Sequence, residues 1–393
     1  MKKIVVSAPG KLMLLGEHAV VYNRPCIVTA VNQRMKATVE LTNEPVFQLN
    51  APDVKVTDYK KPMSELGVGD IPKGTKFVEI AVKNFLASQS TSDVGIPNEV
   101  KKMRLHLKRG LIAQGGVKIT TVSEFSSRFG FGSSSASAVC VIKALSEITG
   151  ANLDSKSIFD LSYKTVLDIQ GKGSGFDVAA AVYGGTLYYV TPGKTIEPLN
   201  IDSLPLIVGY SKIKVDTVTL VNQVLEKAKQ YPKVIENIYD AIGKLVEQAK
   251  GAILSKNWPM LGDLMNINEG YLAALGVESK KLADMIYEAR NAGAYGAKLS
   301  GAGGGDCIIA IAPEDKKQTV ADGIIAAGGQ IIDIETNTEG VRIESVPKIE
   351  RAITTDIEKR AFLKLVGGMG ASFFLVSLLN KKLGGYLPGA AGF

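Results

Sequence analysis

Cysteines are few in this sequence, and none has the spacing of a metal site. The 393-residue chain has three, Cys26, Cys140 and Cys307, far apart in apolar or glycine-rich surroundings and without a CxxC pair. Zinc sites commonly use closely spaced Cys or His ligands, and disulfide frameworks need several cysteines in a short secreted chain. We therefore expect neither, and a reducing, cytoplasmic location fits best.

Basic residues are numerous but nowhere concentrated. The formal net charge is +7 at pH 7, with lysine and arginine scattered along the chain. Nucleic-acid-binding domains usually gather these residues on one face or in one tract, so we expect no nucleic-acid partner. The basic and apolar start of the chain is interrupted by Pro9, Gly10, Lys11 and Glu17, which argues against a secretory signal.

An apolar run near the C-terminus is too short for a typical membrane-spanning helix. It covers residues 365–379, within a distinct tail at 348–393, whereas a span needs roughly 20 residues. Such a run is typical of an interfacial anchor or a partner-docking helix, and equally of a helix packed on the body or a frayed tail. We expect at most a weak membrane or partner contact there.

Apolar periodicity predicts an α+β chain in two halves. In the first half, strands are predicted at 3–9, 35–41, 115–125 and 186–191, and helices at 136–149 and 155–170. Pro192, Gly193 and the polar stretch up to residue 202 suggest a domain boundary. In the second half, helices are predicted at 217–255, 257–276 and 279–292, and strands at 205–211, 306–313 and 328–336. This order favours a second, separately built α+β layer.

The segment FGFGSSSASAV, residues 129–139, places glycines and serines directly before a predicted helix. Free backbone N–H groups and the helix dipole favour an anion such as phosphate at a helix N-terminus. A capped helix after a glycine turn explains the pattern equally well without a ligand. Ser135 stands where the dinucleotide fingerprint needs its third glycine, and only a near miss of the P-loop pattern occurs, at residues 69–76.

Two further glycine-rich segments and a lysine near the N-terminus favour a phosphate site over a capped helix without a ligand. SAPGKLMLLGEHAVV places Lys11 in a predicted Pro-Gly turn, GKGSGFDVAAAVYGG presents Asp177, and KLSGAGGGDCIIA supplies another glycine cluster. Phosphoryl transfer needs donors around the phosphates, a cation and a carboxylate near the attacking hydroxyl. Lys11 could still be a solvated turn residue and Asp177 a helix N-cap, but together the segments favour a phosphate site.

On these three motifs, the chain resembles the GHMP small-molecule kinases over residues 1 to about 347. The resemblance implies an ATP co-substrate bound by the second and third motifs. The implied ATP-binding residues are Gly130, Phe131, Gly132, Ser133, Ser134, Ser135, Gly301, Ala302, Gly303 and Gly304.

The first motif is most similar to the mevalonate kinase branch of that family. The resemblance implies catalytic roles for Lys11 and Asp177 and substrate binding by Glu17 and His18. It also implies Mg²⁺, with Ser134 as a ligand. Val166 stands where the family usually has a glutamate ligand, so Asp168, the nearest carboxylate, is the substitute we predict.

The implied reaction is ATP-dependent phosphorylation of the primary hydroxyl of mevalonate to 5-phosphomevalonate, a step of isoprenoid biosynthesis. QGKGSGFDVAAAVYGG and GAGGGDC are closer to phosphomevalonate kinases, so 5-phosphomevalonate is the alternative acceptor. That acceptor would need extra cations, for which Arg24, Arg34 and Arg128 are candidates. A non-catalytic sensor of ATP or of a metabolite is the alternative of another class.

The resemblance also implies the fold. We expect a two-domain α+β GHMP kinase fold, with residues 1–200 similar to domain 2 of ribosomal protein S5 and residues 201–347 ferredoxin-like. The tail at 348–393 would follow as a separate segment. Many members of the family form dimers, so a homodimer is a further expectation.

Overall fold

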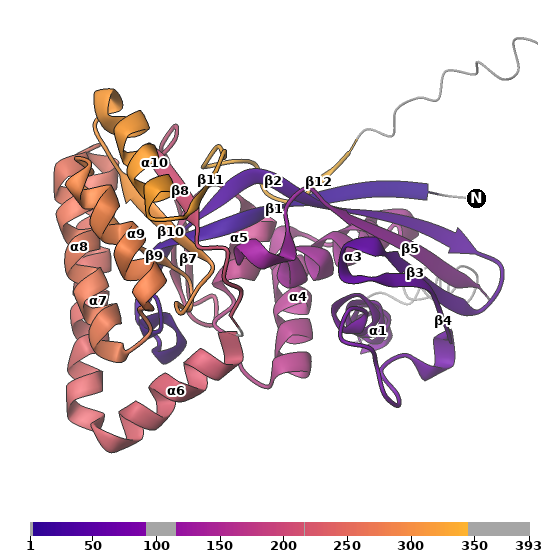
Figure 1. Ribbon diagram of the computed structural model, residues 1–393. Coiled ribbons are helices and arrows are strands. Elements are labelled where there is room, and N and C mark those ends of the chain that lie inside the picture. The colour runs from indigo at the N-terminus through magenta and orange to yellow at the C-terminus, as the bar shows by residue number, and fades with distance from the viewer. Residues whose placement is uncertain (1–2, 92–114, 216, 345–393) are drawn as a thin grey trace, which may run out of the picture. The chain divides into compact units, whose positions relative to one another are not determined.

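A large mixed sheet forms the first part of the computed structural model, which describes residues 3–91, 115–215 and 217–344 (Figure 1). Within these residues the strand order is β12-β1-β2-β5-β3-β4, with β6 paired to β2 and β7 paired to β6. The strands are β1 (Lys3–Leu15), β2 (Pro25–Thr42), β3 (Val46–Ala51), β4 (Val56–Pro62), β5 (Gly116–Ser123), β6 (Thr186–Val190), β7 (Thr195–Leu199) and β12 (Arg342–Ile343).

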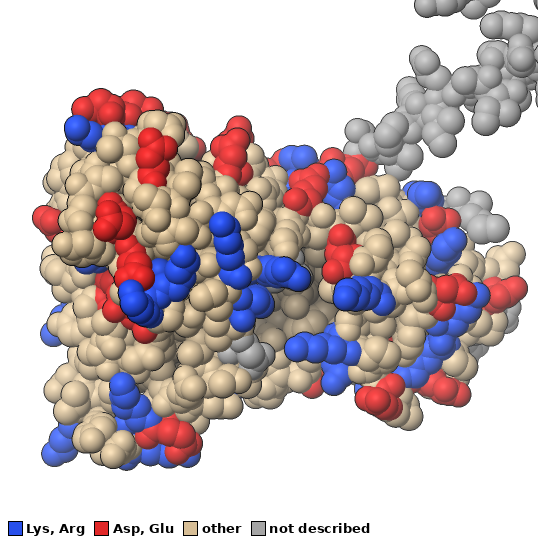
Figure 2. Space-filling model, in the orientation of Figure 1, with Lys and Arg blue, Asp and Glu red and all other residues tan. Residues whose placement is uncertain are grey.

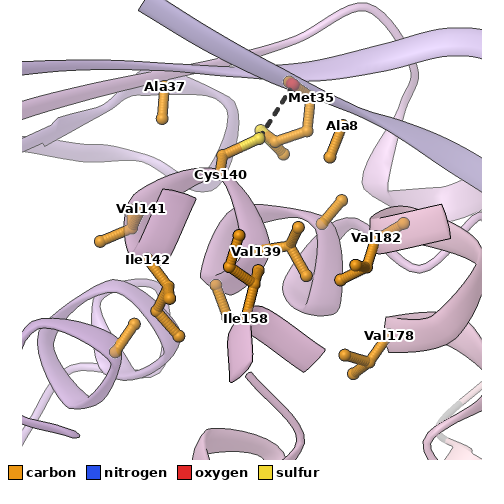
Figure 3. Packing of buried hydrophobic residues seen from close by; sticks show 14 of the residues in the cluster. Ala8, Met35, Ala37, Val139, Cys140, Val141, Ile142, Ile158, Val178 and Val182 are labelled. Atoms are coloured by element: carbon orange, nitrogen blue, oxygen red, sulfur yellow. Dashed lines mark hydrogen bonds between the residues drawn. The ribbon is translucent and has the colours of Figure 1, made fainter. Parts of the chain in front are cut away.

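Helices cover one face of this sheet (Figure 1). They are α1 (Lys76–Thr91), α3 (Ser133–Thr149), α4 (Ser155–Gln170) and α5 (Phe176–Tyr183). Helix α3 is apolar on most sides because it packs against β1, β2, α1 and α4. Figure 3 shows Val139 and Ile142 among its neighbours, with the Cys140 thiol donating to the carbonyl of Met35 at 3.3 Å. The helix ends at Gly150, whose φ of 73° suits a glycine C-cap.

The second sheet is antiparallel throughout, and its order within the described residues is β11-β8-β10-β9. Numbered along the chain, this is the 4-1-3-2 order of a ferredoxin-like βαββαβ unit, which confirms the predicted α+β fold. Its strands are β8 (Leu206–Tyr210), β9 (Gly296–Ser300), β10 (Cys307–Ile311) and β11 (Gln330–Ile332). Its helices are α6 (Thr217–Gln230), α7 (Pro232–Leu254), α8 (Trp258–Leu275), α9 (Lys280–Asn291) and α10 (Lys317–Ala326).

Short 3₁₀ turns complete the described elements, at Ala19–Tyr22, Pro52–Val54, Met63–Glu65, Ser127–Phe129 and Glu314–Lys316. Pro192 and Gly193 lie in the turn of the β6–β7 hairpin, within the first sheet. The chain passes to the second sheet between β7 and β8, and β12 returns to pair with β1. Both sheets therefore belong to one compact unit, Met1–Glu344.

Three local expectations were wrong. Lys11 lies inside strand β1, not in a turn, because β1 and β2 stay paired on both sides of a register shift between Pro9 and Gly10. The predicted helix at 217–255 is two helices, since Pro232 begins α7 at a position where proline needs no N–H partner. Helix α1 was missed.

None of the described helices is long and apolar enough to cross a membrane. The tail at 348–393, with its predicted anchor or docking segment, lies outside the described residues.

Candidate active site

A cavity of about 640 Å³ brings the three glycine-rich motifs together. Figure 2 shows lysine and arginine side chains around a hollow in the molecule's face. The predicted site residues that line the cavity are Lys11, Glu17, His18, Gly130, Gly132, Ser133, Ser134, Ser135, Asp177, Gly301 and Ala302.

The loop before helix α3 has the geometry of a phosphate cradle. Gly130 and Gly132 have φ values of 74° and 80°, in the left-handed region, and Ser133 begins the helix. The first backbone N–H groups of a helix have no partner within it, so they can bind an anion. A Cβ on Gly130 would lie 2.6 Å from Asp306 Oδ2, so a side chain there would displace this carboxylate.

Lys11 extends from β1 to this loop. Its ammonium donates to the carbonyl of Gly130 at 2.7 Å, and its backbone N–H donates to the carbonyl of Phe131 at 3.0 Å. The side chain is buried. Burial lowers the pKa of Lys11, and the charges of Asp177 and Asp306 oppose that effect. Lys11 is therefore a buried lysine whose ammonium is held beside the glycine-rich loop before α3.

Asp177 approaches the same loop from the first turn of α5. Ser135 donates a hydrogen bond from its hydroxyl to Oδ2 of Asp177. A Cβ on Gly132 would lie 3.4 Å from Lys11 Cε and 3.6 Å from Asp177 Cβ, so the lysine and the aspartate lie close together beside this glycine. A cation, a carboxylate and free helix N–H groups thus converge on one part of the cavity.

The other predicted pair, Glu17 and His18, also lines the cavity. Glu17 is 1% exposed; its Oε1 pairs with Lys298 and its Oε2 accepts from Asn268 Nδ2 at 3.2 Å. His18 Nε2 lies 2.9 Å from the carbonyl of Ala302, so it carries the proton of that hydrogen bond. Burial lowers the pKa of His18. The Glu17 carboxylate is already bound to protein groups, whereas His18 has its second ring nitrogen to offer.

Asp168 is not placed in the cavity. Its Oδ2 accepts from Lys164 at 2.5 Å and from Asn84 at 2.9 Å, while Val166 lines the cavity. Residues two apart on a helix point about 200° apart, so Asp168 of α4 cannot replace a ligand at the Val166 position.

Three predicted ATP-binding residues, Phe131, Gly303 and Gly304, are not among the residues that line the cavity. Phe131 is buried, with its ring centroid 5.7 Å from that of Phe125. Added Cβ atoms on Gly303 and Gly304 would lie 2.3 Å from the carbonyl oxygen of Val277 and 3.0 Å from Leu220. These residues shape the motifs through packing.

Four charged residues of the cavity were not among the predicted site residues: Lys73, Lys172, Lys214 and Asp306. Lys214 lies 3.1 Å from both oxygens of Asp306, and Lys172 donates to Asn222 at 2.6 Å. Asp306 was visible at the end of the third glycine cluster. Lys172 lies in the glycine-rich segment that presents Asp177 and Lys73 lies in the near miss of the P-loop pattern, whereas Lys214 comes from a connecting segment without a motif.

The arginines predicted to supply cations are not among the cavity-lining residues. Arg24 binds Asp240, with Nε 3.1 Å from Oδ1, and Arg34 donates to the Ser7 hydroxyl at 2.6 Å and to the carbonyl of Gly340 at 2.7 Å. The guanidinium groups of Arg24 and Arg34 are therefore bound to other parts of the protein and stabilise the fold.

Comparison with known proteins identifies the class. The family profile described as "GHMP kinases N terminal domain" matches residues 98–185, and "GHMP kinases C terminal" matches residues 249–330. The chain is 37% identical over 357 residues to the mevalonate kinase of Pyrococcus furiosus, covering 88% of this chain and 100% of that protein. The chain belongs to the GHMP kinase family, whose co-substrate is ATP.

Solved structures of two branches of the family share the fold. L. major mevalonate kinase in complex with R-mevalonate is 24% identical, with a TM-score of 0.64 over 86% of this chain and 96% of that one. Streptococcus pneumoniae phosphomevalonate kinase, in complex with phosphomevalonate and AMPPNP, is 17% identical, with a TM-score of 0.65 over 86% and 100%.

Proposed function

We propose that this protein transfers the terminal phosphoryl group of ATP to the primary hydroxyl of mevalonate, forming 5-phosphomevalonate and ADP. The observation that carries the proposal is that Lys11 and Asp177 lie close together beside Gly132, directly before helix α3. The 37% identity to a mevalonate kinase along nearly the whole chain supports mevalonate as the acceptor. The product would feed isoprenoid biosynthesis.

The chemistry follows from the charges around the loop. The acceptor hydroxyl loses its proton to Asp177 as its oxygen bonds to the terminal phosphorus, and the bond from that phosphorus to the ADP oxygen breaks. Asp177 already accepts a hydrogen bond from the Ser135 hydroxyl, so its carboxylate can receive an O–H donor. Lys11 stabilises the negative charge that develops, and burial strengthens this effect because water screens it less.

Mg²⁺ fits the donor set of the cavity. The described residues contain no group of three or more His, Cys, Asp or Glu side chains arranged to hold a metal. Mg²⁺ bound with a nucleotide needs only one or two carboxylates in addition to phosphate oxygens. The oxygen donors near the loop are the Ser134 hydroxyl and the carboxylates of Asp177 and Asp306. The ion would neutralise phosphate charge there, and Asp168 would have no part in holding it.

One observation favours 5-phosphomevalonate as a second candidate acceptor. Lys73, Lys172 and Lys214 line the cavity in addition to Lys11, and a lysine that the ATP phosphates do not engage would suit the phosphate group of this acceptor. A sensor without catalysis is disfavoured, because binding alone does not need both a lysine and an aspartate beside Gly132.

The test is ADP release by the purified full-length protein with ATP and Mg²⁺, offering mevalonate or 5-phosphomevalonate, with ³¹P NMR of the product. We expect turnover with mevalonate and a phosphomonoester signal. Turnover with 5-phosphomevalonate alone, giving a diphosphate signal, would transfer the assignment to the second candidate. Turnover with neither would contradict the proposed function.

A further inference from the structure

A fully buried ion pair includes Glu17, one of the residues that line the cavity. Lys298 of strand β9 and Glu17 are 0% and 1% exposed, and the Lys298 ammonium pairs with Glu17 Oε1. The same ammonium donates to the carbonyl of Leu299. Burying two charges costs several kcal/mol per ion before their attraction is counted. The ion pair is therefore weak evidence for a gain in stability, and its presence in the interior points to a role other than stabilising the fold.

A second carboxylate shares this interior. Glu269 of α8 is 3% exposed; its Oε2 accepts from the backbone N–H of Leu299 at 2.9 Å, and its Oε1 has no partner among the described residues. Burial raises the pKa of Glu269 to about 7. When Glu269 is protonated, it is neutral, and the positive charge of Lys298 is balanced by the negative charge of Glu17 alone.

The ion pair links the segment that contains Glu17 and His18 to the segment that contains Lys298 and Ala302. Glu17 precedes His18, whose φ of 58° is left-handed, a conformation that costs of order 1–3 kcal/mol for a non-glycine residue. Lys298 precedes the segment ending in Ala302, whose carbonyl binds His18 Nε2 at 2.9 Å. Ser300 also accepts from the backbone N–H of Met13 at 3.1 Å and donates to its carbonyl at 2.9 Å. These contacts hold the strained residue between the two motifs.

We propose that Lys298 is a positioning residue for the acceptor: through Glu17 it holds His18 in its left-handed conformation and thereby fixes the imidazole in the cavity wall. Lys298 itself is fully buried and therefore does not touch the substrate. The proposal deepens the proposed function, since it names what orients the acceptor side of that site.

The kinetic test compares Lys298→Met with Lys61→Met. The control removes the partner of Glu79, which is also 0% exposed and lies 2.8 Å from the Lys61 ammonium, but this pair is outside the cavity lining. For Lys298→Met we expect the acceptor KM to rise about tenfold, the loss of roughly one well-placed hydrogen bond, with the KM for ATP within about twofold. Lys61→Met should lower the melting temperature and leave both KM values unchanged.

The double variant Glu17→Gln with Lys298→Met guards against a general folding defect. It removes both charges and keeps an amide that can bind Asn268. We expect its melting temperature to return most of the way to the wild-type value, and its acceptor KM to be lower than in Lys298→Met but still above the wild-type value. An unchanged acceptor KM in Lys298→Met, or equal rises in both KM values, would overturn the positioning role.

Histidine NMR separates this proposal from the proposed function. The chain has two histidines, His18 and His106, so His18→Gln assigns their imidazole signals without any substrate. In the wild type, burial holds the pKa of His18 below 6.5. Lys298→Met should shift the His18 signal and raise its titration midpoint, and Lys61→Met should not. A His18 signal identical in both variants would overturn the proposal, even if the wild type phosphorylates neither acceptor.

Discussion

Two buried lysines have different surroundings: Lys11 lines the cavity, and Lys298 lies outside the lining but is paired with Glu17, which is part of it. Lys298 is paired with Glu17 and surrounded by backbone and amide groups. Lys11 donates to one carbonyl and forms no ion pair among the described residues, although the charges of Asp177 and Asp306 act on it. A buried ammonium without a direct counter-ion is unfavourable unless a ligand supplies the anion. The comparison supports the role that we propose for Lys11 towards the phosphoryl group, whereas the Lys298 ammonium is bound by Glu17 and a backbone carbonyl.

The largest effect is expected on the Lys11 side of the cavity. Asp177→Asn keeps the size of the side chain and its bond to Ser135, but it removes the group that takes the proton. We expect kcat to fall about 10²- to 10⁴-fold, with ATP affinity by calorimetry nearly unchanged. Wild-type turnover in this variant would contradict the role of Asp177.

A second prediction concerns the pH dependence of folding stability near Lys298. The pKa of Glu269 rises from its usual 4.5 to about 7, chiefly through burial, under the charges of Lys298, Glu17, Glu278 and Arg290. A raised carboxyl pKa stabilises the fold below about pH 4.5, and this contribution is lost as pH rises through about 7. It amounts to about 3 kcal/mol at most.

The measurement is thermal unfolding of the wild type and Glu269→Gln between pH 5 and 8. The wild type should lose several degrees more than Glu269→Gln over this range. Parallel curves for the two proteins would show that Glu269 does not titrate within the folded interior.

The smallest effect is expected for Asp168→Asn. Because Asp168 is bound by Lys164 and Asn84 away from the cavity, the Mg²⁺ concentration for half-maximal activity should change less than about twofold, as for an exposed surface pair. Asp306→Asn is the matched variant inside the cavity. A large rise in the Mg²⁺ requirement for Asp168→Asn would restore the prediction made from its place in the sequence.

The sequence predicted the fold and the residues that meet in the cavity better than it predicted the contacts of those residues. The α+β fold, the phosphate loop and the approach of Lys11 and Asp177 to it follow from glycine-rich motifs, because glycine reports a backbone that must come close to something. The role of Asp168 as a metal ligand stays a prediction, although helix periodicity turns its side chain away from the direction of Val166, which lines the cavity. Glu17 could be found from its motif, but its partners could not, since Lys298 and Asn268 come from strands and helices more than 250 residues away.

The division between the two lysines is tested most directly by steady-state kinetics of Lys11→Met and Lys298→Met, side by side with the acceptor that the wild type phosphorylates. Lys11→Met should lower kcat about 10²-fold or more, the usual cost of removing a preorganised charge at a transition state, with little change in acceptor KM. Lys298→Met should raise the acceptor KM and leave kcat nearly unchanged. If both variants lose kcat alone, or both lose acceptor binding alone, the two lysines share one role and the account is wrong.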